Sequence, residues 1–379
     1  MIQNEIIKMR KRLTRAGSGG FSIYLPKKWV RGWSRDQVKD REVEMFNIEN
    51  YLILAPKGSK KKIEISVEHI DSEDLKEYIV SSFINGADEF RLQSSLLTDA
   101  LIGESRSIIR MLDENLEPTS NNNVVSYINR SSIAHETPSL IALLFDKLSD
   151  GENLILELIQ SFDSNPEKGI HLLRLLYMLE EEDIDRIAFQ IMRNVSKLDV
   201  SSHSITELNL VWAMADALER IGDTLYSITG LICDFYGLER EELRYPVEYL
   251  QQHIVSKNFT LPECVRHLKD DISSDMRNCY SFLLRIKKSI LERNGRDALR
   301  CAHDIACYMK RTERDYWDKI AKIARPLAIR EYSSFLLCNS LALSMWNLLL
   351  LTEGLAKRLA LVYYVDQKTR SAEIYNDQE

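Results

Sequence analysis

Hydrophobic residues recur with two different periods along this chain of 379 residues. Before residue 57 they alternate with polar residues in short runs, which is the pattern of β-strands, and Gly17–Gly20 is typical of a turn. From about residue 137 onward they recur every three or four positions, which predicts long helices. The predicted helices span 138–162, 166–196, 203–236, 258–293, 295–323 and 329–363. Six such helices in succession predict two three-helix units.

Residues 57–130 combine both periods. The predicted elements are strands over 61–67, 89–92 and 124–128 and helices over 72–87 and 98–113. The polar stretch Thr119–Asn123 is typical of a loop. We assign no chemistry to this segment from its sequence and expect it to connect the other two parts.

One hydrophobic core seldom organises a chain of this length, so several domains are expected. The predicted fold class is multidomain and mainly α. The predicted domains are an N-terminal β domain over 1–56, a small α/β connecting domain over 57–130, and a helical domain of two three-helix bundles over 131–379.

Charge is unevenly distributed along the chain. The net charge is −7, but residues 1–35 carry nine Lys or Arg against one Glu, which leaves −15 for the rest. Such a basic arm suits a polyanion, and its alternating cations project from one face of a strand. The candidate DNA-binding residues are Lys8, Arg10, Lys11, Arg12, Arg15, Lys27 and Lys28. The alternative is a solvated strand edge protected by charge.

The segment Ser22–Trp29, S-I-Y-L-P-K-K-W, follows Arg10-Lys11-Arg12 and a Gly/Ser turn. These residues resemble the AbrB-type (SpoVT/AbrB) swapped-hairpin DNA-binding domain. The resemblance implies an intertwined homodimer whose basic strands and loops contact DNA. The chain departs from that family at Val38–Asp40, where a Gly-Asp turn is common.

Carboxylates gather on the predicted helices. At about 100° per residue, Asp216, Glu219 and Asp223 fall on one stripe, opposite an apolar stripe that supplies the core. The same geometry relates Glu182 and Asp185, and 133 residues later come Asp315 and Asp318, which indicates an internal duplication. The candidate metal ligands are Glu182, Asp185, Asp216, Glu219, Asp223, Asp315 and Asp318. The alternative is that these acids only keep the helix surface soluble.

Oxygen-only clusters of this kind suit hard or borderline cations. The expected cofactor is a divalent or trivalent metal ion (Mg, Mn, Fe or Zn), and no organic cofactor is expected.

The segment Leu218–Asp223, L-E-R-I-G-D, resembles a motif of the PhoU family of phosphate-uptake regulators, and Glu182–Arg186 resembles the acidic turn before it. The resemblance implies two tandem three-helix bundles that carry E/D-x-x-x-D metal motifs and repress phosphate uptake. In the second repeat the counterparts of Glu219 and Asp223 are Glu353 and Lys357. Because a lysine replaces an acid, a second metal cluster is expected to be weak or absent.

Catalytic motifs are missing from the sequence. No H-E-x-x-H, G-x-S-x-G, P-loop or Rossmann pattern occurs, so the protein is not expected to be an enzyme. The six cysteines lack C-x-x-C spacing, and the N-terminus lacks a signal peptide, which indicates free thiols and a cytoplasmic location. The uncharged run Ser333–Leu351 contains Asn339 and Asn347, which favours a buried bundle helix over an integral membrane segment.

The expected function is a dimeric, DNA-binding transcriptional regulator of phosphate homeostasis, whose helical domain senses phosphate status directly or through a metal or signalling protein. A second hypothesis is an accessory protein that does not bind DNA and instead docks on and inhibits a phosphate transporter. A third, a metal-dependent hydrolase, requires an open coordination position and a general base, and the sequence identifies neither.

Overall fold

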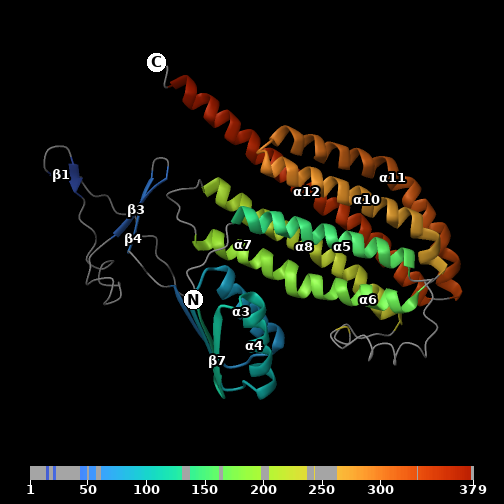
Figure 1. Cartoon of the computed structure of the whole chain (residues 1–379), viewed down its shortest axis with the longest axis horizontal. Helices are drawn as coiled ribbons and strands as arrows, with labels where there is room; N and C mark the ends of the chain where they lie inside the picture. Colours follow the sequence, from blue (N-terminus) through green and yellow to red (C-terminus); the bar gives the residue numbers. More distant parts are fainter. Residues whose placement is uncertain are drawn as a thin grey trace. The chain divides into compact units, whose positions relative to one another are not determined.

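The chain forms two compact units, Met1–Lys60 with Asp199–Ser202, and Lys61–Leu198 with His203–Glu379 (Figure 1). The structure is a computed structural model. It describes residues 14–16, 20–22, 43–48, 51–56, 61–129, 137–161, 165–197, 205–236, 243, 263–330 and 332–376.

Two antiparallel hairpins are described in the first unit. Strand β1 (Thr14–Ala16) pairs with β2 (Gly20–Ser22), and β3 (Val43–Ile48) pairs with β4 (Tyr51–Pro56). The alternating pattern before residue 57 therefore does form β-structure in these segments.

A four-stranded sheet begins the second unit. Its elements are β5 (Lys62–Val67), α3 (Ser72–Ile84), β6 (Glu89–Ser94), α4 (Asp99–Leu112), β7 (Leu116–Asn121) and β8 (Val124–Asn129). The strand order is β5-β6-β8-β7, with β5 parallel to β6 and the other pairs antiparallel. Alternate strand residues such as Phe90, Leu92 and Tyr127 are buried in one core with Ile79 and Phe83 of α3.

The loop predicted over Thr119–Asn123 is wrong for its first half, because β7 runs to Asn121. This strand lies at an edge of the sheet, and among the described strands it pairs with β8 alone. An edge strand tolerates Pro118 and polar side chains, because one side of its backbone faces no neighbouring strand. Polarity alone therefore did not distinguish an edge strand from a loop.

The rest of the second unit is mainly helical, as predicted. Its helices are α5 (Thr137–Ser161), α6 (Pro166–Met178), η1 (Leu179–Ile184), α7 (Asp185–Lys197), α8 (Ile205–Tyr236), α10 (Glu263–Leu291), α11 (Gly295–Arg330) and α12 (Tyr332–Asn376). The first four predicted helices agree with these bounds within about five residues, except that a π-helical turn interrupts the second. The last two helices run further than predicted, to Arg330 instead of 323 and to Asn376 instead of 363.

A single hydrophobic core extends through all of these helices. Helix α5 packs against α10, and α8 packs against α12, so the first three long helices share their core with the last three. Figure 1 shows the long helices lying side by side. Met214, Leu218, Ile221, Leu225 and Ile232 are buried, which confirms the apolar stripe predicted for α8.

One described helical segment, Tyr332–Leu361 of α12, is long and apolar enough to cross a membrane, and 44% of its apolar window is buried inside the protein. Leu348 and Leu359 lie in the shared core. None of the cysteines whose side chains are described forms a disulfide; Cys233, Cys279, Cys301 and Cys338 are buried, and Cys307 is exposed.

Candidate metal centre

A π-helical turn positions the first two acids of the centre. In η1 the backbone N–H of Asp185 donates to the carbonyl oxygen of Glu180, five residues earlier. A π-turn therefore places residues i and i+5 on one face, and single turns of this kind are frequent at functional sites. Glu180 and Asp185 are both buried.

The third acid comes from the neighbouring helix α8. Glu180, Asp185 and Asp223 each offer a carboxylate oxygen, and these oxygens lie within 4.8 Å of one another. A hydrogen bond joins Glu180 and Asp223, and Asp223 is on the exposed side of the group. We call these three residues the acidic cluster. No other group of three potential ligands is this close among the residues that the structure describes.

Gly222 allows α8 to approach the π-turn. A Cβ atom built on Gly222 would lie 2.6 Å from Cγ2 of Ile184, closer than real Cβ contacts come. Ile184 is the last residue of η1 and is buried. The glycine of the L-E-R-I-G-D segment is therefore needed for the distance between the two helices that carry the acidic cluster.

Burial and like charges disfavour ionisation around the cluster. The pKa of Glu219 is raised to about 8, first by burial and then by the charges of Asp223, Asp185 and Asp216. Burial also raises the pKa of Asp223, against the hydrogen bond with Glu180 and the charges of Lys76 and Arg220, which lower it. A bound cation would reverse this balance, because it stabilises the ionised carboxylates.

The structure brings some of the predicted ligands together and not others. Asp185 and Asp223 lie in the cluster, and Glu219 is close enough that their charges raise its pKa. Asp216 forms an ion pair of 3.3 Å with Arg220 one turn away. The side chain of Glu182 lies outside the described part of the chain.

Glu180 was missed by the sequence analysis. Regular α-helical spacing pairs Glu182 with Asp185, whereas the extra residue of the π-turn pairs Glu180 with Asp185. The run Glu180-Glu181-Glu182 gives three candidate acids but does not reveal the change of helical phase.

The second repeat contains no such cluster among its described side chains. Asp315 and Asp318 are exposed, and Asp318 pairs with Arg314 at 4.0 Å. Lys357 forms an ion pair of 2.6 Å with Glu353, so the lysine that replaces an acid also neutralises the remaining one.

The candidate DNA-binding side chains lie outside the described residues. Arg15 belongs to strand β1 by its backbone, and Lys8, Arg10, Lys11, Arg12, Lys27 and Lys28 fall in segments that the structure does not describe.

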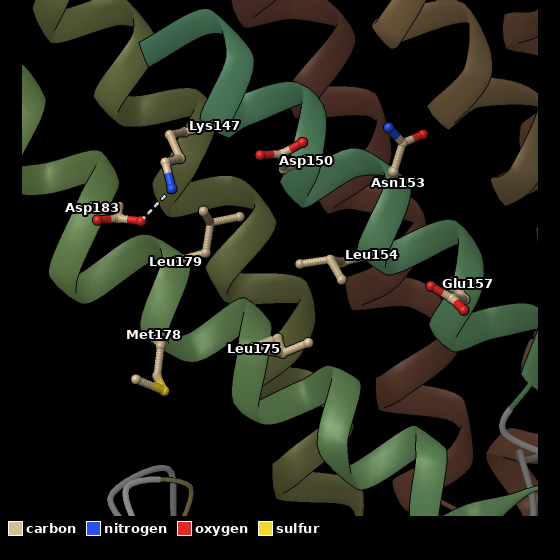
Figure 2. A pocket seen from close by; sticks show the side chains of 9 residues that line it. All are labelled: Lys147, Asp150, Asn153, Leu154, Glu157, Leu175, Met178, Leu179 and Asp183. Carbon is tan, nitrogen blue, oxygen red and sulfur yellow. Dashed lines mark hydrogen bonds and ion pairs between the residues drawn. The ribbon is translucent and has the colours of Figure 1, made fainter. Parts of the chain in front are cut away.

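A groove of about 480 Å³ runs beside the same π-turn, between α5 and the α6–η1 segment (Figure 2). Its lining residues are Lys147, Asp150, Asn153, Leu154, Glu157, Leu175, Met178, Leu179 and Asp183. Asp183 is held by Lys147 at 2.6 Å and by Arg186 at 2.9 Å. Because two cations already neutralise Asp183, it is not counted with the acidic cluster.

The other end of α7 is fixed to the α/β sheet region. Arg193 donates to the carbonyl oxygen of Phe83 at 2.9 Å, and its guanidinium lies 4.5 Å from the centre of the Phe83 ring. Ser196 donates to the carbonyl oxygen of Ile84 at 2.6 Å. These carbonyls belong to the last turn of α3, where helix carbonyls lack partners within the helix. Side chains of α7 therefore cap α3.

Two further contacts extend this junction. Lys197 pairs with Asp88 at 2.7 Å, and Gln190 donates to the carbonyl oxygen of Leu112 at 3.2 Å. Helix α7 thus begins at the acidic cluster and ends on the α/β elements.

Fold and site together define a mainly helical protein with a small four-stranded sheet and an acidic cluster between two helices. A comparison with protein-family models found no match to this chain, and a comparison with curated proteins found none either.

Proposed function

We propose that this protein is a DNA-binding transcriptional regulator of phosphate uptake, in which the helical part senses and the N-terminal strands bind DNA. The observation that carries the proposal is the path of α7, which joins the acidic cluster to the α/β elements. The basic arm of residues 1–35 is the proposed DNA-binding part of the chain. The L-E-R-I-G-D segment is the basis for the proposed role in phosphate regulation. In this proposal the N-terminal strands form an intertwined dimer, and the helices form two three-helix units.

The donor set of the acidic cluster fits a hard cation. Glu180, Asp185 and Asp223 offer only oxygen atoms, which Mg²⁺ and Mn²⁺ prefer. Two of the three are buried, where negative charge is costly, and a cation would stabilise the ionised carboxylates and relieve their mutual repulsion. The proposed role of the ion is purely electrostatic: it would supply positive charge at the acidic cluster. Since Glu219 has a pKa of about 8, metal affinity is expected to fall as pH drops below that value.

Coupling follows from the contacts at the two ends of α7. A cation at the cluster changes the charge around Asp185, the first residue of this helix, and Arg193 and Ser196 at its other end hold α3. Lys76 of α3 also acts on Asp223 electrostatically, so a bound cation would repel it. A shift of α7 would therefore be transmitted to α3 and to the sheet that α3 packs against. These α/β elements precede the helical part in the chain. Such coupling between distant sites is typically worth 1–3 kcal/mol.

The test is DNA binding by fluorescence anisotropy over a salt series, with and without Mn²⁺. The unchanged chain should bind with a steep salt dependence, and the triple variant Lys8→Ala/Arg10→Ala/Arg12→Ala should lose both affinity and slope. Mn²⁺ should change the DNA affinity of the unchanged chain by about 5-fold or more. Asp185→Asn/Asp223→Asn should abolish that Mn²⁺ effect.

The matched control is Asp315→Asn/Asp318→Asn, which removes two exposed acids from the second repeat and should leave the Mn²⁺ effect unchanged. If the unchanged chain and the triple basic variant bind DNA weakly and alike, the basic arm does not bind DNA. The accessory protein that inhibits a phosphate transporter then becomes the leading function.

A further inference from the structure

Helix α12 exposes a row of leucines that the described part of the chain leaves uncovered. Leu336, Leu343 and Leu350 follow one another at intervals of seven residues and are 45%, 56% and 46% exposed. No charged residue lies between Tyr332 and Thr352 on any side of the helix. A seven-residue leucine repeat on a helix surface is the pattern that packs against another helix.

Small or polar residues lie four positions after each leucine. They are Ser340, Asn347 and Gly354, and with the leucines they form one stripe along the helix. We call these six residues the α12 seam. Gly354 is in the middle of a long helix, where glycine costs about 1 kcal/mol relative to alanine. A Cβ atom on Gly354 would meet nothing within 4 Å among the residues that the structure describes. Packing within that part of the chain therefore gives no reason for a glycine here, whereas at Gly222 it does.

We propose that the α12 seam binds the α12 seam of a second copy of this chain, in an antiparallel pair about a two-fold axis. With the axis beside residue 345, Leu336 faces Gly354 of the second copy, Leu343 faces Asn347 and Leu350 faces Ser340. Every leucine then enters a space left by a smaller side chain, as in knobs-into-holes packing. The same contacts repeat in both directions, as an isologous interface requires.

The ends of the seam agree with this register. Tyr332 is 66% exposed and Arg358 is exposed, and the same axis brings Arg358 of each copy against Tyr332 of the other. A guanidinium against an aromatic ring is a favourable contact. Asn347 and Ser340 also distinguish a helix partner from lipid, because a partner helix offers hydrogen-bonding groups and an acyl chain does not.

The test is disulfide formation between full-length chains that carry Cys307→Ser and Cys264→Ser, which remove the exposed thiol among the described cysteines and the one thiol whose side chain the structure does not describe. Chains with Leu343→Cys are mixed with chains with Asn347→Cys under mild oxidation. We expect a cross-linked dimer in this mixture. A mixture of Leu299→Cys with Asn347→Cys is the matched control, because Leu299 is 58% exposed but lies on α11, and we expect no cross-link there.

A size exchange tests the packing itself. Adding Gly354→Leu to the Leu343→Cys and Asn347→Cys chains fills the space for Leu336 of the second copy, and the cross-link should be lost. Adding Leu336→Ala as well should restore it. Circular dichroism checks that each variant is folded, and the open space at Gly354 makes that the expected result.

Three results would overturn the proposal. The first is equal cross-linking in the Leu299→Cys control, and the second is cross-linking that persists after Gly354→Leu. The third is preferential cross-linking of Leu343→Cys chains with each other, which would indicate a parallel pair. Absence of cross-linking together with flotation on phosphatidylglycerol vesicles would also overturn it, in favour of membrane contact. The cross-link forms between residues of the α12 seam. Its absence would therefore contradict this proposal without contradicting a dimer through the N-terminal strands.

Discussion

Glu152 is fully buried in α5, and neither of its carboxylate oxygens has a hydrogen-bond partner among the residues that the structure describes. Burial raises the pKa of this group well above its usual value. The folded chain therefore keeps a proton that the unfolded chain releases. The stability that this proton contributes is complete below the unfolded pKa and is lost as pH rises through the folded pKa.

We predict that Glu152→Gln changes the pH dependence of stability. The free energy of unfolding of the unchanged chain should fall relative to that of the variant by up to about 1.4 kcal/mol per pH unit as pH rises above the ordinary pKa of a glutamate, about 4.3. Urea denaturation at a series of pH values measures this difference. Glu157→Gln, on the exposed side of the same helix, is the control. If both variants changed the pH dependence of the free energy of unfolding equally, the prediction would be contradicted.

Gly222 is a second position where one residue decides the site. Gly222→Ala should destabilise the fold by about 1–3 kcal/mol, because its Cβ would overlap Cγ2 of Ile184. It should also weaken Mn²⁺ binding, measured by calorimetry. Gly222→Ala/Ile184→Ala, which removes the overlapping methyl, should recover part of the Mn²⁺ affinity.

Gly103 provides the comparison for this change. It is an exposed glycine of α4, and a Cβ atom there would meet nothing within 4 Å among the described residues. Gly103→Ala should therefore stabilise the fold by up to about 1 kcal/mol. If both substitutions had the same effect, the close approach at Gly222 would not matter.

At the scale of elements, α7 is the link between the acidic cluster and the sheet. Arg193→Met keeps the apolar stem of the side chain but removes its bond to the Phe83 carbonyl oxygen and its contact with the Phe83 ring. The expected loss is about 1–3 kcal/mol of unfolding free energy, because the substitution removes a hydrogen bond from a charged donor together with a cation–π contact, although the N–H of Gly86 still donates to the Phe83 carbonyl oxygen. Hydrogen exchange should become faster in the last turn of α3.

Lys197→Met is the control within the same helix. Its ion pair with Asp88 is partly exposed, and such pairs contribute only about 0–1 kcal/mol. Faster exchange at α3 in both variants to the same extent would show that charge, and not the buried contact of Arg193, holds the junction.

At the scale of the whole molecule, the helices from α5 to α12 share one hydrophobic core. We therefore predict that the two halves of the helical part unfold together. Chains that retain only Trp212 in α8 or only Trp346 in α12, with the other tryptophans changed to Phe, should show the same urea midpoint by fluorescence. Two different midpoints would indicate two bundles that fold independently.

The hydrophobic pattern by itself determined most of the secondary structure of the helical part. Period and length were sufficient there, because each long helix must bury one continuous apolar face. Asp185, Asp223 and Glu219 were also among the ligands predicted from helical spacing, and Lys357 was the reason to expect a weak or absent second cluster. The edge strand β7 was missed, because an edge strand has few buried side chains and resembles a loop in its polarity.

Only the tertiary structure decided which acids meet. The π-turn shifts the helical phase by one residue, and whether such a turn forms depends on packing between α7 and α8, which local sequence does not specify. Burial of Glu152, the caps that α7 places on α3, and the uncovered seam of α12 are likewise relations between segments far apart in the chain. Such relations depend on which surfaces meet in three dimensions, and the periodicity of one segment does not determine them.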